Sequence, residues 1–168
     1  MIYYNNSHNK ILHNQSPTYT YSWNDITLSN IKQFILDRQQ FRTNEVCLHE
    51  FGIDKSRFDF ISINPYSQRI RILEYKVDKN DYMNDSKHQN YMNYCNTLIF
   101  VTPFDMVDEV KTQCGLLQVF KWTRNSRNGL GGIWIRKPKV KTMDNGIYTH
   151  IVGMMLVRLV QGRKPDFF

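Results

Sequence analysis

Residues 57–91 decide the fold of this chain, and they read RFDFISINPYSQRIRILEYKVDKNDYMNDSKHQNY. A strand-like segment lies on either side of a polar turn. Period-two alternation over residues 70–77 puts Glu74 and Lys76 on one face of the second strand. Asp59 lies in the first strand, among apolar residues. Pairing of the two strands would bring Asp59 beside Glu74, so we expect a hairpin that carries two neighbouring carboxylates.

A carboxylate pair of this kind favours a divalent cation. Two adjacent carboxylates repel each other unless a cation lies between them. Oxygen-rich ligation suits Mg²⁺ or Mn²⁺. Glu45, at the start of another strand-like segment, is a candidate third acid, and Glu50 is its competitor. A Glu-x-Lys tripeptide alone also occurs on solvated strands, and the preceding Asp59 is what makes a metal site the stronger interpretation here.

The order of the predicted elements indicates an α/β (α+β) fold. Helical spacing of Ile31, Phe34 and Ile35 predicts one helix, and the unbroken apolar run of residues 98–101 predicts a buried central strand. We expect a mixed central sheet flanked by helices, in the order helix, strand, strand, strand, helix, strand. The predicted ranges are a helix over 27–40, strands over 44–51, 57–64 and 69–77 with a turn at 52–56, a helix over about 84–93 capped by Asp81 or Asn84, and a strand over 98–101.

The two ends of the chain differ in character. Residues 1–25 are polar and aromatic, and we expect a loose arm with one short strand at 19–23. Residues 26–168 are expected to form a single domain, since 168 residues bury a sizeable core without division. Its last part is predicted to contain a hairpin with strands at 115–121 and 132–136, a flexible joint at 129–132, and an amphipathic helix over 146–161 whose inner side carries Ile147, Ile151, Met154, Met155 and Arg158.

Charge indicates a polyanionic partner. The formal net charge is +7 and the sequence pI is about 9.3. Residues 110–143 contain no acidic residue. Trp122 and Trp134 lie among the basic residues there, which suits either stacking on nucleic-acid bases or a place in the core. The residues expected to contact DNA are Arg57, Lys121, Arg124, Arg127, Arg136, Lys137 and Lys139. Arg57, two residues before Asp59, could instead orient that acid through a salt bridge.

Cysteine usage and hydropathy point to a cytoplasmic protein. Cys47, Cys95 and Cys114 are far apart, and no C-x-x-C pair is present. Cys47 and His49 give too few ligands for a zinc site. An odd number of cysteines without a signal peptide is typical of a reducing compartment. No apolar run reaches the roughly 18 residues of a membrane span, and we expect no membrane partner.

The spacing of Asp59 from Glu74-Tyr75-Lys76 resembles the motif of the PD-(D/E)XK nuclease superfamily. Several segments together are similar to one branch of it, the MmcB-type DNA repair proteins. The resemblance implies a restriction-endonuclease-like αβββαβ core and a Mg²⁺-dependent deoxyribonuclease in DNA repair or processing. It spans roughly residues 26–121 and is carried by residues 44–48, 57–60, 74–95, 98–103 and 115–117.

The resemblance also implies roles for individual residues. Asp59, Glu74 and the main-chain carbonyl of Tyr75 would hold the ion, with Glu45 completing its ligands. Lys76 would position the attacking water or neutralise charge on the phosphate. The active-site surround would include Asp81, Asp85, Lys87 and Tyr91, with Lys87-x-x-x-Tyr91 echoing the Gln-x-x-x-Tyr element of RecB-like nucleases and His88 standing where relatives tend to carry tryptophan.

Two functions of other classes stay open at the level of sequence. The first is a nucleic-acid-binding module of the same fold without turnover. The second is a protein of a phage or mobile element that binds a host protein through the basic hairpin and the last helix. A homodimer formed through that helix is compatible with its apolar residues.

Overall fold

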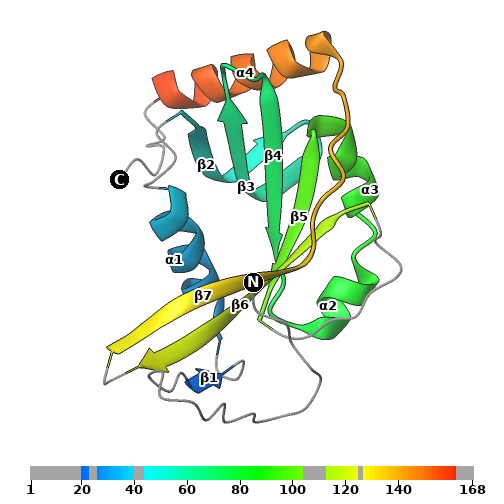
Figure 1. The fold of residues 1–168 in the computed structure, drawn as a ribbon. Helices are drawn as coiled ribbons and strands as arrows, with labels where there is room; N and C mark the ends of the chain where they lie inside the picture. The colour runs from blue at the N-terminus through cyan, green and yellow to red at the C-terminus, as the bar shows by residue number, and fades with distance from the viewer. Residues whose placement is uncertain (1–19, 23–25, 40–43, 104–112, 125–126, 162–168) are drawn as a thin grey trace.

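The computed structural model describes residues 20–22, 26–39, 44–103, 113–124 and 127–161. The described residues form a seven-stranded mixed sheet flanked by helices (Figure 1). The elements are β1 Thr20–Ser22, α1 Leu28–Gln39, β2 Val46–Ile53, β3 Ser56–Asn64, β4 Arg69–Tyr75, α2 Lys79–Asn84, α3 His88–Tyr91, η1 Met92–Tyr94, β5 Thr97–Thr102, β6 Gly115–Arg124, β7 Arg127–Arg136 and α4 Asn145–Val160.

The expected core is present. Strands β2, β3 and β4 form an antiparallel meander, and β5 lies parallel to β4 after the helical connection through α2 and α3. Strand β6 continues the sheet parallel to β5 and pairs antiparallel with both β1 and β7. The α/β class and the order helix, three strands, helix, strand are therefore confirmed. Most of the expected arm over residues 1–25 lies outside the described residues, apart from β1.

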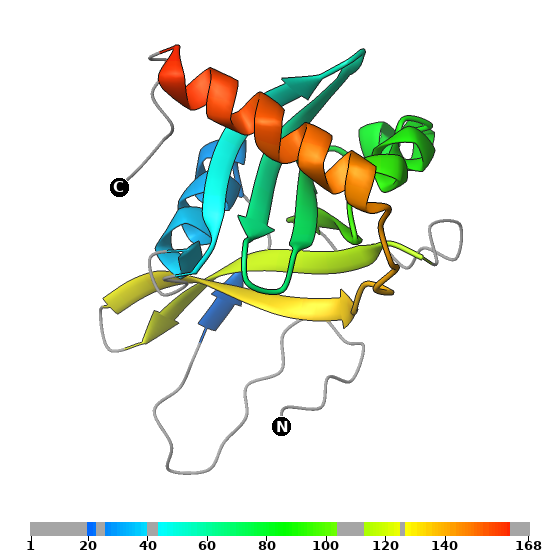
Figure 2. The same cartoon turned by 90° about the horizontal axis from the view of Figure 1, so that it is seen from above.

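Helices cover both faces of the sheet. Figure 2 shows α1 on one side and α4 on the other. Phe34 and Ile35 of α1 belong to a buried cluster with Leu73 and Tyr75. Ile151 and Met155 of α4 belong to a second cluster that also takes in Ile70, Ile72, Tyr82 and Tyr91. The alternation predicted for β4 is confirmed, because Ile72 and Leu73 pack into different clusters.

Period-two alternation, which holds in β4, fails at one place in β3. Phe58 packs into the cluster on the α4 side, whereas Phe60 packs into the cluster on the α1 side. The partner strand is disturbed at the same level, where Glu50 has a positive φ of 50°. A positive φ is uncommon for a non-glycine residue and marks a departure from regular strand geometry at this level of the β2–β3 ladder. Arg158 of α4 donates to the carbonyl oxygens of Glu50 and His49, at 2.8 and 3.1 Å, and holds this bend.

The helix predicted over residues 84–93 is broken into α2, α3 and η1. Helix α2 begins earlier than expected because Asp78, and not Asp81 or Asn84, is its N-cap, accepting hydrogen bonds from the main chain of Asn80 and Asp81. Asp85 then ends α2 with an extended backbone. The break places Asp85 between two short helices, where its carboxylate is free to turn inward.

The predicted flexible joint at residues 129–132 is wrong, because these residues are central in β7. Glycine is required there by close packing and not by a turn. A side chain at Gly129 would collide with Trp122, and one at Gly132 would collide with Phe34. The turn expected over residues 52–56 is likewise shorter, since β2 extends to Ile53 and β3 starts at Ser56.

Gly132→Ala is expected to destabilise the fold by roughly 1–3 kcal/mol, because an added methyl group would overpack the contact with buried Phe34. Gly153→Ala is the matched control, since nothing lies within 4 Å of the position that its added methyl group would take in α4. Alanine in a helix interior is about 0.5–1 kcal/mol better than glycine. Chemical unfolding of both variants tests this, and equal midpoints would contradict it.

The last helix keeps its predicted position with one correction. Ile151 and Met155 are buried as expected, but Met154 is 37% exposed. Leu156, Val157 and Val160 are also exposed on α4. Among the described residues, no helix has both the length and the apolar character that a bilayer crossing demands.

Candidate active site

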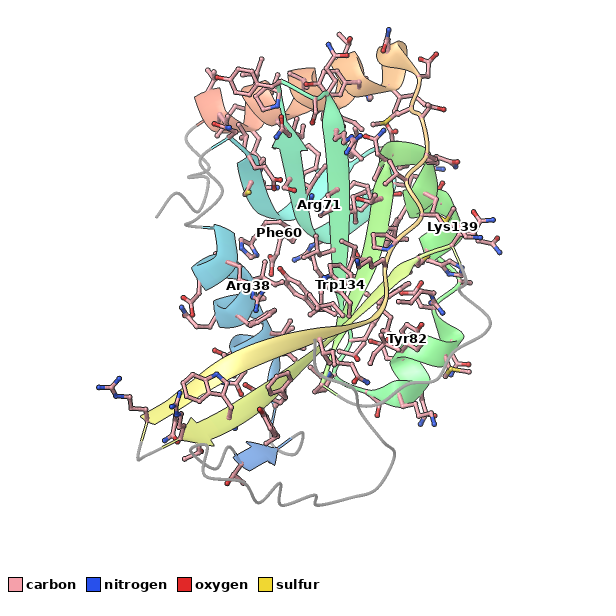
Figure 3. All side chains as sticks on the ribbon, in the orientation of Figure 1. Arg38, Phe60, Arg71, Tyr82, Trp134 and Lys139 are labelled. Carbon is pink, nitrogen blue, oxygen red and sulfur yellow. The ribbon has the colours of Figure 1, made fainter. Side chains whose placement is uncertain are left out.

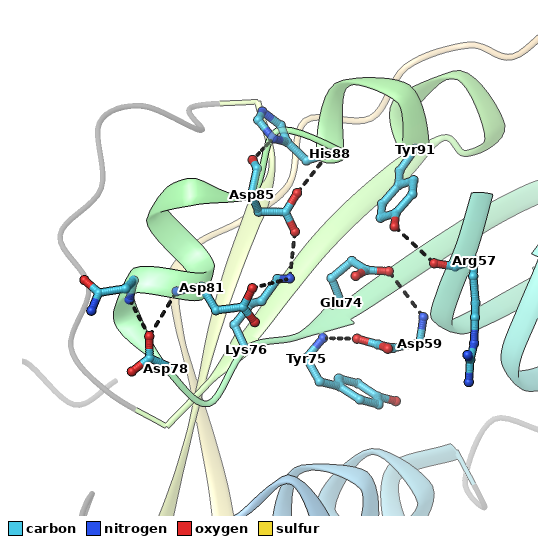
Figure 4. A network of polar contacts seen from close by, with 11 residues as sticks. Arg57, Asp59, Glu74, Tyr75, Lys76, Asp78, Asp81, Asp85, His88 and Tyr91 are labelled. Atoms are coloured by element: carbon cyan, nitrogen blue, oxygen red, sulfur yellow. Dashed lines mark hydrogen bonds and ion pairs between the residues drawn. The ribbon is translucent and has the colours of Figure 1, made fainter. Parts of the chain in front are cut away.

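The end of the β3–β4 ladder brings the two predicted acids together. The last paired residues are Phe60 and Leu73. At the next position, side-chain carboxylates replace main-chain carbonyls as hydrogen-bond acceptors between the two strands. The N–H of Asp59 donates to Oε1 of Glu74 at 3.2 Å, and the N–H of Tyr75 donates to Oδ2 of Asp59 at 2.8 Å (Figure 4). Asp59 and Glu74 are thereby fixed side by side, as the sequence predicts.

The environment of this pair disfavours two negative charges. Glu74 is only 4% exposed. Burial, followed by the negative charge of Asp59, raises the pKa of Glu74 to about 8. The N–H of Asp59 and the ammonium of Lys76 oppose this shift without cancelling it. At neutral pH, Glu74 therefore holds a proton unless a cation takes its place.

Lys76 lies at the end of β4, next to the acid pair, and is held by two aspartates. Its main-chain N–H donates to the carbonyl of Val101 in β5 at 3.0 Å. Its ammonium Nζ lies 2.7 Å from Oδ2 of Asp85 and 3.4 Å from Oδ1 of Asp81. The Asp85 side chain is 3% exposed and that of Asp81 is 60% exposed, so Asp85 is the partner that matters.

The ion pair fixes both charges. Burial by itself would lower the pKa of Lys76, but the hydrogen bond and charge of Asp85 outweigh it and raise that pKa. Burial by itself would raise the pKa of Asp85, but the hydrogen bond from Lys76 outweighs burial and lowers that pKa. Asp85 also accepts a hydrogen bond from the main-chain N–H of His88 at 3.1 Å. The raised pKa and the ion pair with Asp85 therefore favour the ammonium form of Lys76.

Tyr91 covers the pair from α3, and Lys87 does not. The Tyr91 hydroxyl donates to the carbonyl of Arg57 at 3.1 Å, and its ring packs edge-on against Phe58 with centroids 5.0 Å apart. Burial, followed by the charge of Glu74, raises the pKa of Tyr91 to about 12. Lys87 is the N-cap residue of α3 and is exposed, whereas Tyr91 is buried. The N–H of Tyr91 donates to the carbonyl of Lys87 at 3.1 Å, so the two residues are joined by one helical turn.

Tyr91→Phe is expected to cost about 1 kcal/mol of stability, the usual value of one hydrogen bond. Because the hydroxyl is engaged with the Arg57 carbonyl, any phosphodiesterase activity should fall by only a few fold. Unfolding and rate measurements on the same preparation separate the two effects. A loss of rate as large as that of an acid-pair variant would show that the hydroxyl takes part in the chemistry.

Glu45, the predicted third acid, is not at the site. Its carboxylate oxygens lie 3.3 Å from Nη1 of Arg71, on the opposite face of the sheet from Glu74. The register pairs Val46 with Ile63 and Ile63 with Ile70, so Glu45, one residue earlier, lies near the level of Arg69, five residues before Glu74. At about 3.3 Å per residue this is a separation of roughly 16 Å along the strand. The expectation that Glu45 ligates the same ion is therefore wrong.

Arg57 and Glu50 pair with each other. Nη2 of Arg57 lies 2.7 Å from Oε2 of Glu50, and Lys32 lies 3.6 Å from the other carboxylate oxygen. This pairing lowers the pKa of Glu50, mainly through its hydrogen bond to Arg57. The Arg57 side chain is 71% exposed and remains within reach of a polyanion, as its predicted contact with DNA requires.

The other predicted DNA contacts lie on the β6–β7 hairpin and the segment after it. Arg127, Lys137 and Lys139 are exposed, whereas Lys121, Arg124 and Arg136 are half-buried. Arg136 donates from Nε to the carbonyl of Cys114 at 2.8 Å. The two tryptophans lie in different environments, since Trp122 packs over Gly129 whereas Trp134 is 41% exposed.

In the described part of the chain, no group of three or more His, Cys, Asp or Glu side chains is arranged to hold a metal ion. The acid pair offers two carboxylates. Sequence reasoning placed this pair correctly but missed the ion pair of Asp85 with Lys76. The signals for it were an aspartate shortly after the lysine and the resemblance that placed Asp85 around the active site, whereas the break between α2 and α3 that turns Asp85 inward was not predicted.

Comparisons with known proteins add the fold and no function. No family model matches this chain, and no curated protein matches its sequence. A solved structure that is similar is the SPO1766 protein of unknown function from Silicibacter pomeroyi. It superposes with a TM-score of 0.60 at 15% sequence identity, covering 82% of this chain and 89% of that one. The likeness at this identity concerns the arrangement of helices and strands, and this chain shares that mixed α/β architecture.

Proposed function

We propose that this protein is a divalent-metal-dependent phosphodiesterase that cleaves DNA. The observation that carries the proposal is the acid pair of Asp59 and Glu74 with the ammonium of Lys76 beside it. Their spacing along the chain resembles the PD-(D/E)XK motif. The two acids meet at the open end of the β3–β4 hairpin, away from its turn. A role in DNA repair or processing remains part of this proposal, as does the MmcB-like resemblance.

The donor set fits a hard cation such as Mg²⁺ or Mn²⁺. The hydrogen bonds of the pair use Oδ2 of Asp59 and Oε1 of Glu74, and within the described residues the other oxygen of each carboxylate makes no hydrogen bond. Together with the carbonyl oxygen of Tyr75, these atoms would hold the ion. Such an ion, when bound, polarises the scissile phosphate and lowers the pKa of a bound water.

Lys76 would stabilise negative charge and would not act as a base. Its pKa is raised and its ammonium is anchored by Asp85. A fixed ammonium stabilises charge that builds on a phosphate oxygen, an effect worth about 10²–10³ in rate where a comparable donor is removed. Asp85 therefore positions Lys76. Lys87, exposed at the start of α3, would contact the phosphate backbone of the substrate.

DNA is the proposed substrate because of the charge of the chain. The net charge is +7, and the acid-free stretch over residues 110–143 includes the β6–β7 hairpin. Basic side chains release counterions from a phosphate backbone, which gives affinity that falls with salt. Arg127, Lys137 and Lys139 are exposed and suited to such contacts.

A cleavage panel tests the proposal. Labelled linear duplex, single-stranded, flap and four-way-junction DNA are incubated with Mg²⁺, Mn²⁺ or EDTA, with Asp59→Asn beside the wild type. We expect metal-dependent cleavage that leaves a 5′-phosphate and a 3′-hydroxyl and is absent in the variant. Equal cleavage by Asp59→Asn would refute the site. A gel shift in EDTA without cleavage on any substrate would instead support the non-catalytic binding module.

A further inference from the structure

A cleft lies on the other side of the sheet from the acid pair. It has a volume of about 400 Å³, within the range of roughly 300–1,000 Å³ that small-molecule sites occupy. Arg71, on β4, lines it together with Arg69, whereas Glu74 on the same strand faces the α4 side. The cleft is bounded by α1, the start of β4, and the end of β7 with the segment after it.

The cleft is positively charged. The charged residues that line it are Arg38, Arg69, Arg71 and Glu45. Glu45 neutralises Arg71, whose side chain is 31% exposed, and leaves Arg38 and Arg69 as exposed guanidinium groups. Guanidinium groups bind phosphate oxygens with two parallel hydrogen bonds, a geometry that ammonium groups do not offer.

One wall of the cleft is aromatic and accessible. Trp134, the largest side chain that lines it, is 41% exposed. Figure 3 shows the labelled side chains of Arg38, Arg71 and Trp134 in the region between α1, β7 and the sheet. Nucleobases stack on such rings regardless of sequence, with a gain of about 1–3 kcal/mol per base.

The packing next to this wall is tight. Phe34 of α1 packs directly against Gly132 of β7, where an added Cβ would collide with the Phe34 ring. The guanidinium of Arg38 lies 4.4 Å from the centre of the Phe34 ring. This cation–π contact positions one arginine at the rim before any ligand arrives, which reduces the entropy lost on binding.

We propose that this cleft binds one nucleotide unit, with the base stacked on Trp134 and the phosphate held by Arg38 and Arg69. The unit is either a free mononucleotide or a nucleotide within a strand, since both present the same base and phosphate. The proposal does not depend on hydrolysis at the acid pair, because that pair faces the other side of the sheet. It assigns Arg38 and Arg69 a function that the sequence did not predict, and it gives Trp134 the base-stacking role that the sequence left as one of two alternatives.

Binding is measured on the wild-type chain in EDTA, so that cleavage plays no part. Two probes are used: deoxyadenosine monophosphate by calorimetry, and a short fluorescein-labelled single-stranded oligodeoxynucleotide by anisotropy. The variants are Arg38→Ala/Arg69→Ala and Trp134→Leu, which change exposed side chains and leave the Glu45–Arg71 pair intact. Lys55→Ala, in the β2–β3 turn, removes one positive charge away from the cleft and serves as the control.

We expect both cleft variants to raise the Kd by about ten-fold or more, the size of one lost stacking or charge-assisted contact, and the control to leave it nearly unchanged. A response to the monophosphate identifies a free nucleotide as ligand, and a response to the oligonucleotide alone identifies a nucleotide within a strand. Either result supports the proposal. Wild-type affinity in both cleft variants, or no binding of either probe to the wild type, would overturn it.

Discussion

Glu74→Gln is expected to abolish metal-dependent cleavage and, at the same time, to stabilise the metal-free protein by roughly 3 kcal/mol at pH 7. The two effects have one cause. Glu74 is buried beside Asp59, and its pKa is raised to about 8 by burial and by that neighbouring charge. Glutamine keeps the shape and an acceptor for the N–H of Asp59, but it carries no charge to desolvate and is a poor ligand for a divalent ion.

The stabilisation must depend on pH in one direction. Below the unfolded pKa of about 4.5, Glu74 is protonated in both states and contributes no difference. As pH rises towards the folded pKa of about 8, the unfolded chain loses its proton first, and the wild type becomes progressively less stable than the variant. Above pH 8 the difference levels off. Glu74→Gln should therefore match the wild type in acid and exceed it in alkali.

Urea unfolding in EDTA at a series of pH values, together with cleavage in Mg²⁺, measures both effects. Glu50→Gln is the control, because Glu50 is exposed and its pKa is lowered by Arg57 and Lys32. It should retain activity and gain no stability in alkali. If Glu74→Gln cleaves like the wild type, Glu74 does not hold a catalytic ion. If the variant shows no pH-dependent gain in stability, burial beside Asp59 does not raise the pKa of Glu74 as described here.

Lys76→Met is expected to lower cleavage by about 10²–10³ and to destabilise the fold by roughly 3–5 kcal/mol. The second effect arises because Asp85, 3% exposed at its side chain, loses the partner at 2.7 Å that neutralises it. A carboxylate left buried without a cation must either take up a proton or be solvated by water that enters the protein interior. The exposed Asp81 is expected to be affected much less.

The double variant Lys76→Met/Asp85→Asn separates structure from chemistry. Removing both charges should recover most of the lost stability, since no uncompensated ion is left, while cleavage stays as low as in Lys76→Met. Lys79→Met, at the exposed start of α2, is the control for loss of a lysine in this region. Recovery of activity in the double variant would show that Lys76 acts only through the fold and not on the phosphate.

Much of the core followed from local sequence rules. Period-two alternation in β4 put Glu74 on the side of Ile70 and Ile72, and the structure agrees. The hairpin of β3 and β4 then brought Asp59 to it. These features are local, because the side-chain direction in a strand has a fixed period and a short turn fixes the register.

Other features failed because they depend on contacts between distant segments. The glycines of β7 suggested a loop, but they lie in a strand where Trp122 and Phe34 leave no room for a larger side chain without repacking. Glu45 looked like a metal ligand, yet its partner is Arg71 on the opposite face. No pattern within a single segment contains either relation, since each was fixed by which elements pack together.

The sequence by itself determined the order of elements and the two acids that face each other, because both follow from backbone periodicity and one short turn. Only the tertiary structure decided how charged these acids are, since the raised pKa of Glu74 comes from burial by other segments. It also decided that Asp85 holds Lys76 and that Arg38, Arg69 and Trp134 share a cleft. Those residues meet through packing across the sheet, which the spacing of residues along the chain does not encode.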